Sequence, residues 1–178
     1  MSYVEVFRVK KDGNVVSFDS ETRNNHGGAP LIWDKITELY GIEYKMMSES
    51  TWDNLFSADS IDKYTREHKI LMLSTCDRVW IRKEIIDELI VAYENFHKQF
   101  VRDQYVDTVN QLAKVLKEWQ RKHKSDIGIA FNMCSAITPF WYRGTSDRPY
   151  NVFKDKEQRR GEYQGKSAWE LVEHMKNL

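Results

Sequence analysis

The sequence predicts an α+β fold: a small mixed or antiparallel sheet with an N-terminal β-hairpin, packed against an antiparallel pair of helices. Two observations lead to this class. Side chains with a period of two mark short strands near the N-terminus and near residue 130, and a period of 3.6 marks two long amphipathic segments between residues 83 and 124. With 178 residues and 41% apolar content, the chain is expected to form one domain over residues 1–178.

The hairpin is the first element. Side chains alternate in character from Tyr3 to Val9, the sequence Lys-Asp-Gly-Asn follows at 11–14, and a second strand begins at Val15. Asp, Gly and Asn between two alternating runs are typical of the tight turn of a β-hairpin.

A polar loop with two glycines follows and leads into a helix. Pro30 suits the first turn of a helix, apolar residues recur at helical spacing up to Tyr40, and Gly41 ends the pattern. The N-terminus of a helix attracts anions, so the loop is a candidate ligand site. Its candidate ligand-binding residues are Arg23, Asn24, His26, Gly27 and Gly28. It lacks the spacing of a P-loop, and a tight turn into a helix is the simpler interpretation.

The middle of the chain is predicted from shorter patterns. Residues 42–68 are expected to hold short helical pieces, and the apolar run at 70–73 fits a strand buried on both faces. Residues 74–77 are predicted to form a turn and residues 78–82 a second strand.

Two helices are then predicted, from about Lys83 and from about Asp103. Each has one apolar stripe, and the second ends in a group of basic residues, as the helix dipole favours. We expect them to pair as a helical hairpin. Their buried stripes are Ile85, Ile86, Leu89, Ile90, Tyr93, Phe96 and Phe100, and Tyr105, Val109, Leu112, Leu116 and Trp119.

The strand predicted at 127–134 has one face of large apolar side chains and one of small side chains. The small face includes Asn132 and Cys134, and it leaves room for a ligand that Asn132 would bind as donor and acceptor. The alternative, which we favour, is that a long helix packs on the small face.

Aromatic residues and arginines alternate in the segment 139–166, a composition used both for stacking bases and for binding proteins. We expect the segment to lie at the surface; the alternative is a loop whose aromatic rings enter the core. The candidate ligand-binding residues are Trp141, Tyr142 and Arg143, and the candidate partner-binding residues are Phe140, Arg148, Tyr150, Phe153, Arg159 and Arg160. A capping box at 167–170 predicts a short terminal helix.

Composition excludes several classes of function. Lys and Arg number 27, as do Asp and Glu, which argues against bulk attraction to nucleic acid or to an anionic membrane. No run of residues resembles a signal peptide or a membrane span, and two distant cysteines, Cys76 and Cys134, indicate reduced thiols in a cytoplasmic protein. The five scattered histidines predict no metal site, and no cofactor is expected. A homo-oligomer is compatible with the sequence.

Three stretches resemble small uncharacterised bacteriophage accessory proteins: YVEVFRVKKDG at 3–13, the RN…GGA…IW pattern over 23–33, and LSTCDRV at 73–79. The resemblance implies no catalytic residues, but compact phage accessory proteins often act by binding. We therefore expect a non-enzymatic protein of a bacterial cytoplasm that inhibits a host defence protein or sequesters a small nucleotide-like signalling molecule. The alternatives are a thiol hydrolase or transferase using Cys134, and a weak nucleic-acid-binding module that uses the segment 139–166.

Overall fold

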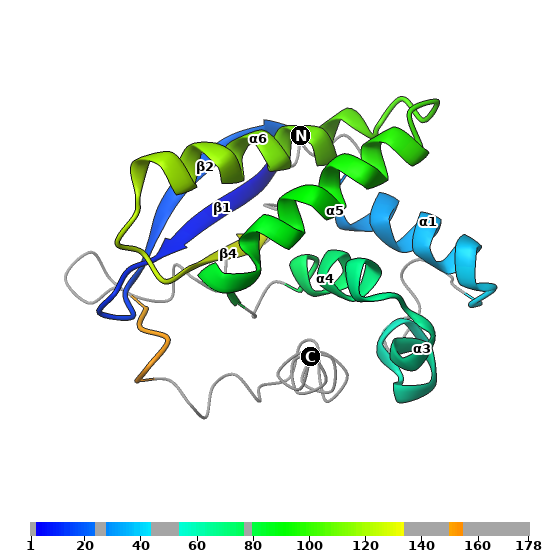
Figure 1. Ribbon diagram of the computed structural model, residues 1–178, viewed down its shortest axis with the longest axis horizontal. Coiled ribbons are helices and arrows are strands. Elements are labelled where there is room, and N and C mark those ends of the chain that lie inside the picture. The colour runs from blue at the N-terminus through cyan, green and yellow to red at the C-terminus, as the bar shows by residue number, and fades with distance from the viewer. Residues whose placement is uncertain (1–2, 24–27, 44–53, 77–79, 134–149, 155–178) are drawn as a thin grey trace.

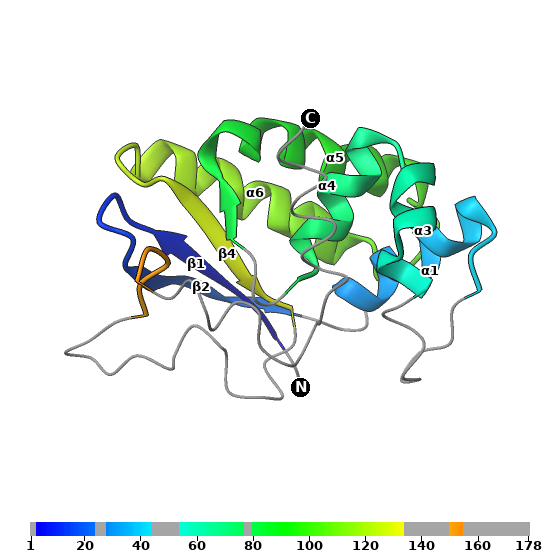
Figure 2. The same ribbon diagram turned by 90° about the horizontal axis from the view of Figure 1, so that it is seen from below.

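The computed structural model describes residues 3–23, 28–43, 54–76, 80–133 and 150–154 (Figure 1). These residues form a four-stranded antiparallel sheet with helices stacked on one of its faces (Figure 2). The predicted α+β class, with an N-terminal hairpin and a paired set of helices, is confirmed.

The sheet has the strand order β2-β1-β4-β3. Its strands are β1 (Tyr3–Val9), β2 (Val15–Arg23), β3 (Trp80–Arg82) and β4 (Gly128–Asn132). The first and last of these strands in the sequence are therefore neighbours at the centre of the sheet, where Val9 pairs with Gly128 and Glu5 pairs with Asn132. These backbone hydrogen bonds join strands that lie more than 100 residues apart in the sequence.

The hairpin turn has the chemistry that the sequence predicts. Gly13 takes the left-handed backbone conformation, with φ at 84°. The backbone N–H of Asn14 donates to Asp12 Oδ1 at 3.1 Å, and the N–H of Gly13 donates to the carbonyl oxygen of Lys10 at 2.8 Å. Two N–H groups of the turn are therefore satisfied locally, while the carbonyl oxygens of Asp12 and Gly13 accept from the distant residues Asn151 and Val152.

Five α-helices are described: α1 (Ala29–Tyr40), α3 (Ala58–Lys63), α4 (Arg66–Ser74), α5 (Ile86–Gln99) and α6 (Asp107–Lys122). A 3₁₀ turn (Lys83–Ile85) precedes α5. The helix predicted to end at Gly41 does so, with that glycine left-handed at φ 61°. The helix predicted at 167–170 lies outside the described residues.

The strand predicted at 70–73 is wrong, because these residues belong to α4. The hydroxyl of Thr65 caps this helix by accepting from the backbone N–H of His68 at 3.2 Å. All residues from Lys69 to Ser74 are buried. A helix enclosed on every side has no polar face, so its sequence reads as the same continuous apolar run that a buried strand would show.

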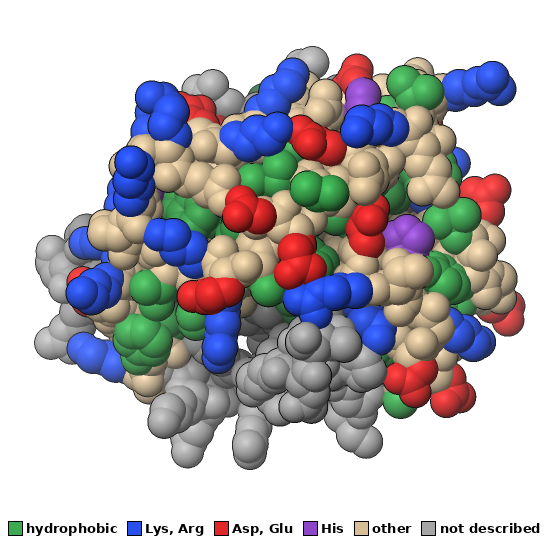
Figure 3. All heavy atoms as spheres, in the orientation of Figure 1, with side chains coloured by type: hydrophobic (Ala, Val, Ile, Leu, Met, Phe, Trp, Pro, Cys, Tyr) green, Lys and Arg blue, Asp and Glu red, His purple; other side chains and the backbone are tan. Residues whose placement is uncertain are grey.

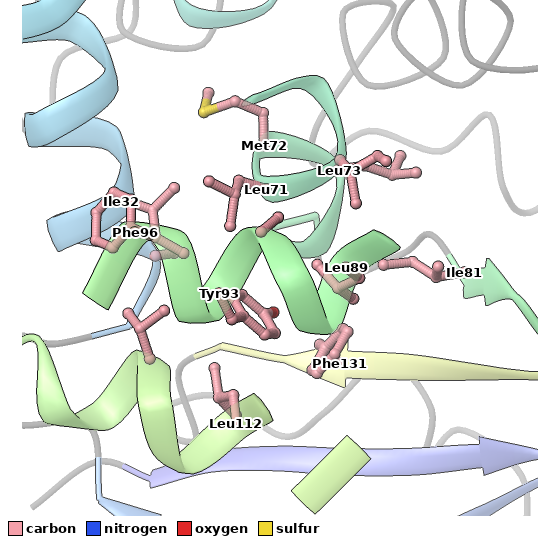
Figure 4. Close-up of a cluster of buried hydrophobic side chains, with 14 of the residues drawn as sticks. Ile32, Leu71, Met72, Leu73, Ile81, Leu89, Tyr93, Phe96, Leu112 and Phe131 are labelled. Carbon is pink, nitrogen blue, oxygen red and sulfur yellow. The ribbon is translucent and has the colours of Figure 1, made fainter. Parts of the chain in front are cut away.

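The main core lies between the helices and the sheet. Helices α5 and α6 form the predicted antiparallel pair, and α4 packs on the other side of α5 (Figure 4). The Tyr93 side chain is fully enclosed between α5, α6 and the sheet, close to Leu112 and Phe131. The predicted buried stripes are confirmed for most of their members, although Ile85, Phe100 and Tyr105 are only partly buried.

The prediction that a helix packs on the small-residue face of β4 is wrong. The helices pack on the large face, where Ile129 and Phe131 join the main core. The small face looks away from the helices and is covered by Tyr150, Val152 and the edge of Trp80. Large side chains are needed to fill the space between a helix layer and a sheet, whereas on the other face the rings of Tyr150 and Trp80 fill the space over small side chains.

We predict that Gly13→Ala destabilises the fold much more than Gly41→Ala. Both glycines have positive φ, which costs an alanine about 1 kcal/mol. A Cβ at position 13 would in addition lie 2.5 Å from Phe153 Cδ2 and 2.8 Å from Asn151 Oδ1, whereas nothing lies within 4 Å of a Cβ at position 41. Urea denaturation should show a loss of about 3 kcal/mol for the first variant and about 1 kcal/mol for the second. Equal losses would contradict the packing of residues 150–154 on the turn.

Candidate functional site

The sheet brings two of the predicted ligand-binding residues to the same end. Arg23 closes β2 and pairs with Tyr3, and Asn132 closes β4 and pairs with Glu5, so both lie beside the start of β1. Gly28 is the N-cap of α1, which carries no acidic residue in its first turn. The other residues predicted in this loop, Asn24, His26 and Gly27, lie outside the described residues.

Asn132 uses its amide within the protein. The side chain is 4% exposed, and its Nδ2 donates to Glu5 Oε2 at 2.9 Å. Both residues sit on the face of the sheet that is turned away from the helices, and Glu5 is partly exposed. The donor that the sequence suggested for a ligand therefore holds the carboxylate of a neighbouring strand.

The described part of the aromatic and arginine segment lies at the opposite end of the sheet. The Tyr150 carbonyl oxygen accepts from the backbone N–H of Val15, and the N–H of Val152 donates to the carbonyl of Gly13. Tyr150 is only 6% exposed, so the expectation that its ring lies outside is wrong, because the ring fills the small-residue face of β4. Phe153 is 51% exposed. The remaining candidates lie outside the described residues: Phe140, Trp141, Tyr142, Arg143, Arg148, Arg159 and Arg160.

A groove that the sequence did not indicate lies between β2 and α6. Figures 1 and 2 show this helix over the edge strand. Its volume is about 550 Å³. Phe18, Asp19 and Thr22 line it from the strand, and Gln111, Lys114, Val115, Glu118 and Lys122 line it from the helix. The pairing of β2 with β1 is irregular between Val4 and Val6 and again between Val6 and Phe7. Such bulges disturb the regular alternation of side chains between the two faces of a strand. Here the bulges lie next to Asp19 and Thr22, which line the groove.

The groove combines an aromatic surface with charges of both signs. The Phe18 ring is partly buried and meets the His123 ring edge-on, with 5.3 Å between the centroids. Val115 lies beside it on α6, and Thr22 donates to Asp19 Oδ2 at 3.5 Å. Lys122 forms an ion pair with Glu118 one helical turn earlier, and Lys114 is exposed at the rim. Flat rings, cations and hydrogen-bond donors would each find a suitable surface here.

A polar cluster adjoins the groove through His123, the ring of which contacts Phe18. Arg8 on β1 contacts Asp126 with two hydrogen bonds, from Nε at 2.7 Å and from Nη2 at 3.0 Å. Asp126 is 2% exposed and also accepts from Trp119 Nε1 at 3.2 Å. His123 Nε2 lies 3.4 Å from Arg8 Nη1. The cluster joins the end of α6 to the central strand of the sheet.

The described residues offer little support for catalysis. The Tyr40 hydroxyl accepts from the backbone N–H of Thr65 at 3.0 Å and lies 2.7 Å from His68 Nδ1, which leaves its own proton for that nitrogen. Burial lowers the pKa of His68, so the ring is a neutral acceptor that ties α1 to α4. The Cys76 thiol is buried 3.7 Å from the carbonyl oxygen of Met72, and Cys134 lies outside the described residues.

Across the described ranges, no three His, Cys, Asp or Glu side chains gather as a metal site would require. No helix found there is long and apolar enough to cross a membrane. The chain matches no protein-family model, no curated protein and no solved structure. The resemblance to bacteriophage accessory proteins therefore stays a hypothesis, and function has to be argued from the geometry.

We predict that Asn132→Ala destabilises the protein by about 1–2 kcal/mol, because Glu5 would lose its amide donor in a mostly buried position. Glu5→Gln, which keeps an acceptor for that amide, should lose less. Urea denaturation at neutral pH measures both. If Asn132→Ala unfolds at the same urea concentration as the unmodified protein, the Asn132 amide does not stabilise the fold. That result would favour the alternative prediction that this amide binds a ligand.

Proposed function

We propose that the protein acts by binding and that it holds a small nucleotide-like molecule in the groove between β2 and α6. The observation that carries the proposal is the combination of size and lining: about 550 Å³, bounded by an aromatic ring, carboxylates and lysines. Sites for small molecules usually measure about 300–1,000 Å³. Six of the eight side chains that line this groove are polar or charged, which suits a ligand that is itself polar and charged.

Each part of such a ligand has a counterpart in the groove. A base would lie against Phe18 and Val115, since flat aromatic surfaces stack well. A phosphate would meet Lys114, whose ammonium group is exposed and close to the rim. Amino or hydroxyl donors of the base or sugar would meet the carboxylate of Asp19.

In this proposal the protein sequesters a nucleotide-like signalling molecule in the cytoplasm of a bacterial host, as the resemblance to phage accessory proteins suggests. The glycine loop and the segment around Trp141, which the sequence suggested as the ligand site, lie mostly outside the described residues and stay predictions. The other three functions expected from the sequence are inhibition of a host defence protein, thiol catalysis at Cys134 and weak nucleic-acid binding through the segment 139–166. They depend on residues that lie wholly or mostly outside the described ranges.

We predict that Phe18→Ala and Lys114→Gln each weaken binding of a nucleotide about tenfold, through loss of stacking and of a phosphate contact respectively. Isothermal titration calorimetry with a panel of linear and cyclic mononucleotides and dinucleotides is the measurement. Lys117→Gln is the matched control, because Lys117 lies on the same helix but pairs with Glu94 of α5.

The control should bind within about twofold of the unmodified protein. Two results would contradict the proposal: no member of the panel binds, or the two groove variants bind as the control does.

A further inference from the structure

Lysines and arginines gather at the end of the molecule where the hairpin turn lies. The strand pairing places Val9, Gly128 and Arg82 side by side across β1, β4 and β3, so the segments that follow or precede them meet at one end of the sheet. The exposed cations there include Lys10, Lys11, Arg82, Arg121, Lys124 and Lys154; the neighbouring Lys83 is also exposed and donates to the carbonyl oxygen of Lys124. Figure 3 shows Lys and Arg side chains along the left margin, where Figure 1 places the turn and the end of α6.

This basic end, defined by those six residues, is only partly balanced by carboxylates. None of the six forms an ion pair within the described part of the chain. Among the described residues, Asp12, Glu84 and Asp87 are the exposed acids nearby, while Asp126 is buried against Arg8. The whole chain carries equal numbers of positive and negative side chains, so an excess here means a deficit elsewhere. Net charge therefore hides the asymmetry.

The arrangement suits a polymer of phosphates more than a compact ligand or a protein. The cations come from several separate segments and spread over one end, so they do not converge on a pocket. The large exposed apolar side chains among the described residues are Leu39, Val91, Val101 and Phe153, and only Phe153 packs at this end, against Gly13. A protein interface would be expected to have an apolar centre, and a membrane surface an apolar wedge.

We infer that the basic end binds the phosphate backbone of a nucleic acid without reading its sequence. Regularly spaced phosphates would exchange their condensed counterions for these lysines and arginines, which makes the affinity depend on salt. The inference is independent of the groove, because none of the six residues lines it.

The test is fluorescence anisotropy with a labelled 20-base-pair DNA at several NaCl concentrations. We expect dissociation constants of roughly 10⁻⁶–10⁻⁴ M that rise steeply with salt. The triple variant K11Q/R121Q/K124Q should bind at least about tenfold more weakly, and its salt slope should be smaller by up to about 3. The control K63Q/K98Q/R102Q changes net charge equally with exposed residues remote from this end, and it should bind like the unmodified protein.

Three outcomes would overturn the inference: no binding by the unmodified protein at low salt, equal losses in the two triple variants, or displacement of DNA by polyglutamate of similar charge. The last outcome would indicate an acidic protein as the partner. Phe18→Ala should bind DNA as the unmodified protein does. A loss of nucleotide binding in the groove can therefore be distinguished from a loss of DNA binding at the basic end. Matching thermal melts confirm that both triple variants are folded.

Discussion

The double hydrogen bond between Arg8 and Asp126 is the contact on which the rest of the structure depends. It joins the first strand to the turn after α6, residues separated by 118 positions in the sequence. Asp126 is buried, and a buried carboxylate deprived of its cation would cost several kcal/mol. Trp119 donates to the same carboxylate, so the end of the helix is held at one place over the sheet.

Both proposed surfaces follow from that placement. The groove lies between α6 and β2, and Val115 of the helix and Phe18 of the strand both line it. The basic end exists because the turn leading from α6 to β4 brings Lys124 beside the hairpin turn and β3. A protein whose net charge is zero thus presents a polar groove and a positively charged end as separate features. Small ligand and polyanion would then be bound by different residues.

Patterns within short segments of the sequence predict much of the fold. Contacts between residues far apart in the sequence leave no such pattern and could not be predicted. The hairpin, α1 and the α5–α6 pair follow from alternation, helical periodicity and turn residues, all of which act over a few positions. The enclosed helix α4 was mistaken for a strand because burial on all sides removes periodicity. Two irregularities in the pairing of β2 lie beside the groove, and Tyr150 is buried by a contact with a distant strand. Neither the irregular pairing nor the burial of Tyr150 can be read from the residues next to it in the sequence.

A double-mutant cycle at Arg8 and Asp126 measures how strongly this contact stabilises the fold. Arg8→Met, Asp126→Leu and the double variant would each be unfolded in urea. We expect each single change to cost about 3 kcal/mol and the double variant to lose less than the sum by about 2 kcal/mol or more. Losses that add to within about 0.5 kcal/mol would contradict this role of the contact, because α6 would then be positioned without it.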